Sequence, residues 1–313
     1  MTPQSRKKTI NRYALIFMQA KFNTIGLVVR QDMHSHLDTV KLVTSALGKH
    51  AKVLVHSLDA DFPIAEIDFP IAEIETVSMI ELVDQCDLVI SLGGDGTLLT
   101  TARALVDKNT PLLGINLGRL GFLADVSVND FEQHLIAVIA GKYTVESRFF
   151  IEGEVDGPNR STSKNIAVND IILHSHESLR MIGYEVYSDG NLIHRQRADG
   201  VIVTTPTGST AYALSGGGPI MHPSLETLAI VPICPHTLSN RPIVLPANQE
   251  IEVRLSEEES IARVNYDGRS SVILNTEDSV RIKRYPHPIT LLHPENYDYF
   301  QILRAKLYWS TNY

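Results

Sequence analysis

The sequence predicts two domains, an N-terminal α/β domain with a doubly wound, mostly parallel sheet and a C-terminal β-rich domain. In the first half of the chain, short apolar runs alternate with stretches in which apolar residues recur at helical spacing. After about Val126, the pattern changes to short runs of alternating apolar and polar residues, as in antiparallel strands. The length of 313 residues accommodates two domains of ordinary size.

The first domain is expected at residues 22–126. Its predicted buried strands are Asn23 to Arg30, Lys52 to His56, Leu88 to Leu92 and Pro111 to Asn116. Helices are predicted between them, at 37–47 and at 97–106, because apolar residues recur there every three or four positions. Strands that alternate with helices pair in parallel, which predicts the doubly wound sheet.

The β-rich domain is expected at residues 127–294. A helical stretch at 131–140 precedes alternating runs such as Ile251 to Leu255 and Val280 to Lys283. The turn-rich tetrapeptide at 188–191 predicts a hairpin between the runs on either side. A last helix is predicted from Tyr299 to Trp309, with its apolar residues on one side.

Two segments do not follow the strand and helix patterns of the domains. Residues 1–21 carry five basic side chains and no acid, and their apolar core is shorter than the roughly 7–15 residues of a signal peptide. We interpret this segment as a mobile basic arm. The heptapeptide DFPIAEI at 61–67 is repeated at 68–74, and its prolines favour an enlarged surface loop that arose by duplication.

Composition excludes several classes of protein. The net charge of −8 disfavours a nucleic-acid binder that works by broad phosphate neutralisation. No apolar run approaches the roughly 18–20 residues of a membrane span. The two cysteines, Cys86 and Cys234, form no disulfide framework and suit a reducing compartment. We therefore expect a cytoplasmic protein with neither nucleic acid nor membrane among its partners.

The strongest chemical signal is the pentapeptide Gly93 to Thr97 (GGDGT), between a predicted strand and a predicted helix. Its glycines let the backbone approach a ligand closely, and the start of a helix favours phosphate. We expect Gly93, Gly94, Gly96 and Thr97 to bind phosphate. Asp95 is expected to stand free in this loop, where a carboxylate either helps hold a metal or accepts a proton from an attacking hydroxyl.

Two further loops follow predicted strands. Gly114 to Phe122 (GINLGRLGF) is a second glycine-rich stretch, in which Arg119 is a candidate phosphate contact. Asp199 to Pro219 (DGVIVTTPTGSTAYALSGGGP) concentrates backbone amides and hydroxyls that suit sugar or phosphate oxygens. The P-loop and Rossmann fingerprints are missing. His174 and His176 share a predicted strand face, and we interpret them as surface histidines, so no residue is predicted as a metal ligand.

Together, these motifs resemble the NAD kinase family. Gly93 to Thr97, Gly114 to Leu123, Asn169-Asp170 and Asp199 to Pro219 occur in the family's order. Pro235 to Ser239 (PHTLS), Arg241-Pro242 and Asp267-Gly268 extend the resemblance, which runs from about Thr24 to Trp309. The GGDGT loop alone is shared with lipid kinases of the diacylglycerol type, whereas the TPTGSTAY segment is far more discriminating.

The resemblance implies the following fold and activity. The second domain would be β-sandwich-like, and the C-terminal helix, from about 295 to 313, would return to the first domain. The protein would phosphorylate NAD at the 2′-hydroxyl of its adenosine ribose to give NADP. ATP would be the phosphoryl donor, with a divalent metal, magnesium, bound mainly through ATP. Self-association to a homotetramer is also implied.

The resemblance also implies site residues, of which Asp95 would be the catalytic one. The implied NAD contacts are Asp95, Gly96, Asn169, Asp170, Arg180, Arg197, Asp199, Thr210, Ala211, Tyr212, Ala213, Leu214 and Ser215. Asp170 stands where many family members have glutamate, and its side chain, one methylene shorter, is still expected to reach a ribose hydroxyl.

Two alternative functions remain open at this point. A lipid kinase of the diacylglycerol type would use the GGDGT loop, and a non-catalytic NAD-binding sensor would keep the fold. The motifs also do not separate ATP from polyphosphate as donor, or NAD from NADH as acceptor, and they say nothing of feedback regulation.

Overall fold

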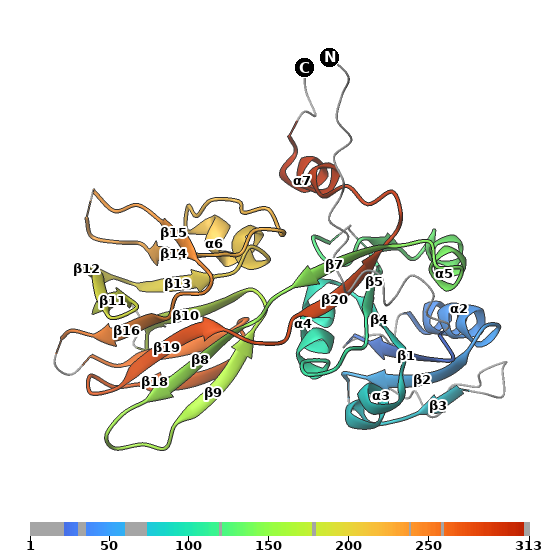
Figure 1. Cartoon of the computed structure of the whole chain (residues 1–313), viewed down its shortest axis with the longest axis horizontal. Coiled ribbons are helices and arrows are strands. Elements are labelled where there is room, and N and C mark those ends of the chain that lie inside the picture. The colour runs from blue at the N-terminus through green and yellow to red at the C-terminus, as the bar shows by residue number, and fades with distance from the viewer. Residues whose placement is uncertain are drawn as a thin grey trace, which may run out of the picture. The chain divides into compact units, whose positions relative to one another are not determined.

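The computed structural model describes residues 22–30, 36–59, 74–118, 121–176, 180–237, 239–257 and 260–309. The chain divides into two compact domains (Figure 1). The first consists of Met1–Glu146 with Thr290–Tyr313, and the second of Ser147–Ile289. The expected basic arm and nearly all of the duplicated heptapeptide lie outside the described residues.

The first domain is built on one sheet with the order β3-β2-β1-β4-β5-β20-β7, to which β6 adds beside β5. Its strands are β1 (Thr24–Val29), β2 (Lys52–Ser57), β3 (Ile74–Thr76), β4 (Leu88–Gly93), β5 (Leu112–Asn116), β6 (Val126–Ser127), β7 (Thr144–Arg148) and β20 (Ile289–His293). The pairs that join β1, β2, β3, β4, β5, β6 and β20 are parallel. Because the chain adds strands first on one side of β1 and then on the other, the order reverses between β1 and β4.

The helices of the first domain are, in chain order, α2 (Leu37–Gly48), α3 (Met79–Gln85), α4 (Asp95–Ala104), α5 (Phe131–Ile139) and α7 (Tyr299–Leu307). The amphipathic pattern explains α2, because Val40, Val43 and Leu47 are buried in the same core as the strands. A capping box begins α3, in which Ser78 accepts from the Glu81 N–H and Glu81 accepts from the Ser78 N–H.

The second domain consists of two six-stranded sheets with the orders β15-β14-β13-β10-β17-β18 and β12-β11-β16-β19-β8-β9. Strands of the first of these sheets are β10 (Asp170–Ser175), β13 (Gly200–Thr204), β14 (Thr227–Ile233), β15 (Ile243–Pro246), β17 (Ala262–Tyr266) and β18 (Ser270–Leu274). Strands of the other are β8 (Ile151–Asp156), β9 (Ser163–Ala167), β11 (Ile182–Ser188), β12 (Asn191–Ala198), β16 (Ile251–Leu255) and β19 (Ser279–Arg284).

One hydrophobic core joins these two sheets. It includes Tyr184 of one sheet and Tyr266 of the other, and the Tyr266 hydroxyl donates to the backbone oxygen of Gly153 at 3.1 Å. The predicted hairpin is confirmed, since Asp189 and Gly190 turn between β11 and β12 with φ angles of 47° and 77°. Two antiparallel sheets around a shared core form the predicted sandwich.

The domain boundaries differ from those expected. The first domain continues to Glu146 rather than to residue 126, because α5 buries Phe131, Leu135 and Val138 in the first core and β7 joins the first sheet. At the far end the chain returns at Thr290 rather than at about 295, because β20 lies between β5 and β7. The last helix, α7, belongs to the first domain, as predicted.

Candidate functional site

The GGDGT loop lies at the switch point of the parallel sheet. β4 ends at Gly93, Gly94 is the N-cap of α4, and the helix begins at Asp95, two residues earlier than predicted. A Cβ on Gly93 would collide with the side chains of Thr97 and Arg30, so only glycine fits there. The positive end of α4 therefore lies beyond the carboxyl end of β4, the edge at which doubly wound sheets bind ligands, and it favours phosphate.

The Asp95 carboxylate is held by the second glycine-rich loop. Its Oδ1 accepts from the N–H groups of Leu123 and Ala124 at 3.1 and 3.0 Å, and its Oδ2 accepts from the N–H of Phe122 at 2.9 Å. A Cβ on Gly121 would run into Asp95 Oδ1, so this glycine permits the close approach. The expectation that Asp95 stands free in its loop is therefore wrong.

This arrangement fixes the carboxylate and still leaves it one acceptor position. A carboxylate has about four lone-pair sites, and three of them receive N–H groups here. Because Oδ2 takes one donor and Oδ1 takes two, the remaining site lies on Oδ2. Asp95 is half-buried, and a ligand hydroxyl that reached Oδ2 could donate to this remaining site.

In the second domain, Asp267 holds the Asn169-Asp170 pair in the same way. Its carboxylate accepts from the N–H groups of Val168, Asn169 and Asp170 at 3.0, 2.8 and 3.2 Å. Asp267 has a φ of 48° and precedes Gly268 in the turn between β17 and β18. The turn thus aims a carboxylate back at three consecutive backbone donors.

The TTPTGST loop holds Asn169 from its other side. The backbone oxygen of Asn169 accepts from the Thr204 hydroxyl at 3.0 Å and from the Thr205 N–H at 2.9 Å. A Cβ on Gly208 would collide with the same carbonyl. The side-chain Oδ1 of Asn169 is buried and accepts no hydrogen bond from the described residues. A hydroxyl or amide donor from a ligand would satisfy it.

Asp170 is an unusual acid. Only 4% of it is exposed. Burial raises the pKa of Asp170 to about 7, and the negative charge of Asp267 adds to that rise. Its carboxyl group is therefore divided between its neutral and ionised forms near neutral pH, as is typical of functional sites.

Two adjoining pockets of the second domain collect other predicted contacts. Arg180, Asp199 and Tyr212 line a pocket of about 680 Å³, and Arg197 lines one of about 760 Å³; both pockets include Met181 and His236.

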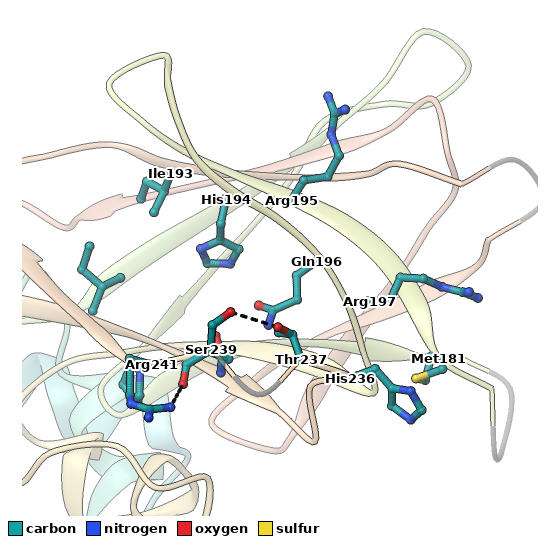
Figure 2. A pocket seen from close by; sticks show the side chains of 13 residues that line it. Met181, Ile193, His194, Arg195, Gln196, Arg197, His236, Thr237, Ser239 and Arg241 are labelled. Carbon is teal, nitrogen blue, oxygen red and sulfur yellow. Dashed lines mark hydrogen bonds between the residues drawn. The ribbon is translucent and has the colours of Figure 1, made fainter.

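Figure 2 shows the larger pocket, with the His194 ring turned toward the loop that carries Thr237 and Ser239. In the same view, Arg195 and Arg197 point outward. They form ion pairs with Glu185 and Glu257, respectively.

Other predicted contacts line neither of these two pockets. Thr210, Ala211, Ala213, Leu214 and Ser215 lie in the short helices η3 (Gly208–Thr210) and α6 (Tyr212–Ser215) or in the link between them. Ala213 is buried in a small core that also contains Ile202 and Val231, so its methyl group does not face solvent. Thr97 is also buried. Arg119 lies outside the described residues.

Sequence reasoning missed the residues that hold the site together. These are Asp267, Gly121 and Gly208, together with the N–H groups of Phe122 to Ala124. Their signal was present as the Asp267-Gly268 turn and the glycine spacing of the loops. The pairing of a carboxylate with a distant loop, however, depends on the tertiary fold.

A helix start that favours phosphate, beside a carboxylate held by three backbone N–H groups, is the arrangement expected of a kinase. The particular family follows from comparison with known proteins. Residues 17–143 match the ATP-NAD kinase N-terminal domain, and residues 168–293 match the ATP-NAD kinase C-terminal domain. An NAD kinase of Acinetobacter baylyi is 44% identical over 292 residues, covering 93% of this chain and 94% of the relative. The chain belongs to the ATP-NAD kinase family.

Other relatives and solved structures agree with this assignment. An NAD kinase of Hahella chejuensis is 42% identical over 295 residues, covering 93% of this chain and 97% of the relative. The structure of yeast NADH kinase complexed with NADH gives a TM-score of 0.83 at 25% identity, covering 94% of this chain and 90% of that one. The structure of an NAD kinase from Archaeoglobus fulgidus in complex with ATP gives a TM-score of 0.69 at 30% identity. The match covers 91% of this chain and 98% of that one.

Proposed function

We propose that this protein transfers a phosphoryl group from ATP to the 2′-hydroxyl of the adenosine ribose of NAD, forming NADP. The observation that carries this proposal is the position of Asp95. It lies in the first turn of a helix whose start favours phosphate, and its carboxylate has one lone-pair site that accepts no backbone N–H. Membership of the ATP-NAD kinase family supplies the substrate class.

In this proposal, Asp95 acts as the general base. The hydroxyl donates to Oδ2, and its proton passes to the carboxylate as the hydroxyl oxygen bonds to the γ-phosphorus and the bond to the leaving ADP oxygen breaks. The N–H groups of Phe122 to Ala124 keep the carboxylate from rotating during this step. Gly93, Gly94, Gly96 and Thr97 shape the helix start that receives donor phosphates.

The second domain would hold NAD. The orphaned Oδ1 of Asn169 and the half-neutral carboxyl of Asp170 suit ribose hydroxyls, which both donate and accept. Arg180, Asp199 and Tyr212 give the smaller pocket a cation, an anion and an aromatic face for the rest of the dinucleotide.

A divalent cation, magnesium, is proposed to arrive with ATP and to neutralise its phosphates. Within the described ranges, no group of three or more His, Cys, Asp or Glu side chains gathers as ligands. A cation held mainly by phosphate oxygens needs no such group. Chelation with EDTA should abolish turnover, and added magnesium should restore it.

The direct test is incubation of the purified protein with NAD, ATP and magnesium, followed by enzymatic detection of NADP. Parallel reactions with polyphosphate as donor and NADH as acceptor define the substrate range. Phosphorylation of diacylglycerol vesicles without NADP formation would indicate the lipid kinase instead. NAD binding without any turnover would indicate the sensor.

Self-association and a cytoplasmic location also belong to this proposal. No helix within the described ranges is both long and apolar enough to cross a bilayer. Light scattering coupled to size-exclusion chromatography tests the homotetramer, and fractionation of the native cell tests the location. A monomer at micromolar concentration would contradict the tetramer.

A further inference from the structure

A buried histidine lies between two carboxylates in the first domain. His293, the last residue of β20, is 1% exposed. Its Nδ1 is 3.0 Å from Asp125 Oδ2, and its Nε2 is 3.1 Å from Glu146 Oε2. The ring also stacks on Tyr297, with 3.9 Å between ring centroids. Neither the phosphate loop nor the predicted NAD contacts include this cluster.

The carboxylates of Asp125 and Glu146 stabilise the protonated form of the His293 ring. A neutral imidazole has one N–H, whereas the imidazolium has two and can donate to both neighbours at once. Burial alone lowers the pKa of His293, but its hydrogen bonds to Asp125 and Glu146, with their negative charges, raise it above its ordinary value. The imidazolium of His293 and the carboxylates of Asp125 and Glu146 are therefore held together by strong, directional hydrogen bonds, and we call these three residues the clamp.

One arm of this clamp ends on the loop that holds the catalytic carboxylate. Asp125 directly follows Phe122 to Ala124, whose N–H groups bind Asp95. After Asp125 the chain enters β6, which pairs with β5. The other arm ends on Glu146 in β7, which is not part of this loop. The cluster thus connects β20 to the loop that holds Asp95 through Asp125.

We propose that His293 is a positioning residue, which anchors Asp125 and thereby holds the backbone donors of residues 122–124 against Asp95. This proposal rests on the proposed catalytic role of Asp95. When the anchor is lost, the loop drifts, and the carboxylate loses its orientation toward the ribose hydroxyl. Because most of the proposed NAD contacts lie in the second domain, the loss falls on turnover more than on substrate affinity.

Two variants separate positioning from simple stability. Asp125→Asn and Glu146→Gln each remove one negative charge from the same ring, but only Asp125 adjoins the loop. We expect Asp125→Asn to lower kcat about tenfold or more, with KM for NAD within about threefold, since small misplacements of reacting groups cost this much. Glu146→Gln should keep kcat within about threefold at a similar loss of melting temperature. His293→Gln should resemble Asp125→Asn.

Hydrogen exchange gives a second readout that does not depend on activity. The amides of residues 122–124 should lose protection in Asp125→Asn and keep it in Glu146→Gln. Equal losses of kcat and of protection in both variants would overturn the proposal, and so would normal values in Asp125→Asn. If His293→Gln fails to fold, the comparison of Asp125→Asn with Glu146→Gln still tests the proposal. A wild-type protein that makes no NADP would instead refute the proposed function.

Discussion

At the scale of single residues, two aspartates organise the candidate site by the same means. Asp95 and Asp267 each accept three consecutive backbone N–H groups from a loop distant in sequence. Hydrogen bonds to charged groups contribute roughly 1.5–3 kcal/mol each. Each carboxylate is therefore structural, and Asp95 keeps one further lone-pair site for chemistry.

The first prediction concerns Asp95→Asn. An amide cannot take a proton, so turnover should fall roughly 10²–10⁴-fold. The sequence alone predicts a near-normal melting temperature. With the observed contacts, the amide NH₂ replaces an acceptor that faces backbone donors, which should cost about 1–3 kcal/mol. Steady-state kinetics and thermal melting check both parts.

A matched control is Asp38→Asn, because Asp38 is exposed in the first turn of α2. It changes the same charge at a helix start and should leave activity and melting nearly unchanged. Loss of a general base should lower turnover by more than about tenfold. If Asp95→Asn retained more than about a tenth of wild-type turnover, Asp95 would not be the base.

The second prediction concerns Asp170 and pH. Its folded-state pKa, about 7, lies above its ordinary value of 3.8. Its contribution to stability is therefore present at low pH and is lost as the pH rises through about 7. The full shift corresponds to a free energy on the order of 4 kcal/mol. Asp170→Asn cannot ionise, so its stability advantage over wild type should grow between pH 4 and pH 8.

Urea unfolding at pH 4, 6 and 8 measures this difference directly. The variant and the wild type should be similar in free energy of unfolding at pH 4, should already differ clearly at pH 6 and should differ most at pH 8. Parallel curves across the whole range would show that Asp170 is not titrating near neutrality.

At the scale of elements, the start of each helix serves a different purpose. α4 begins at glycines and leaves its positive end for a ligand, whereas α3 satisfies its own N–H groups through the Ser78 and Glu81 capping box. α3 buries Leu82 and Val83, and it is only seven residues long. A helix this short depends strongly on its cap.

The third prediction follows from that cap. Ser78→Ala removes the side-chain acceptor of the Glu81 N–H and should destabilise the protein by about 1 kcal/mol. Asp130→Ala is the control, because Asp130 is the N-cap of α5 and makes no side-chain cap bond. Chemical denaturation should show a clearly larger loss for Ser78→Ala, with activity unchanged in both. Equal losses would mean that the capping box contributes nothing.

At the scale of the whole molecule, the second domain is an insertion in the first. The chain leaves the first sheet through β7 and returns through β20, which lies between β5 and β7. Residues 147–289 contain both six-stranded sheets and the core that joins them. The first domain, by contrast, is completed only when the end of the chain returns.

The fourth prediction is that residues 147–289 fold alone. Their core is closed by residues of the same segment, so the fragment should melt cooperatively by circular dichroism. Residues 22–146 are the matched comparison. That fragment lacks β20 and leaves β7 without its neighbour in the sheet, so it should not melt cooperatively. A disordered 147–289 fragment would contradict the expected independence of the second domain.

Much of the fold was predictable because it depends on local patterns. The β4 strand, the glycine loop after it and the hairpin at Asp189-Gly190 each follow from residues adjacent in sequence. The domain boundary was not predictable, because β7 and α5 resemble parts of either domain until their sheet and core are known. Ala213 was predicted as an NAD contact, and only the tertiary structure shows that its side chain is buried in a core.

By itself, the sequence determined the class of fold, the family and the loop that carries Asp95, because periodicity, glycine spacing and motif order are properties of neighbouring residues. The tertiary structure alone decided what holds that loop in place. Asp95 accepts from Phe122 to Ala124 across separations of 27 to 29 residues, and His293 contacts Asp125 across 168 residues. A hydrogen bond between such distant groups exists only once the sheet has brought its strands together, so no local pattern encodes it.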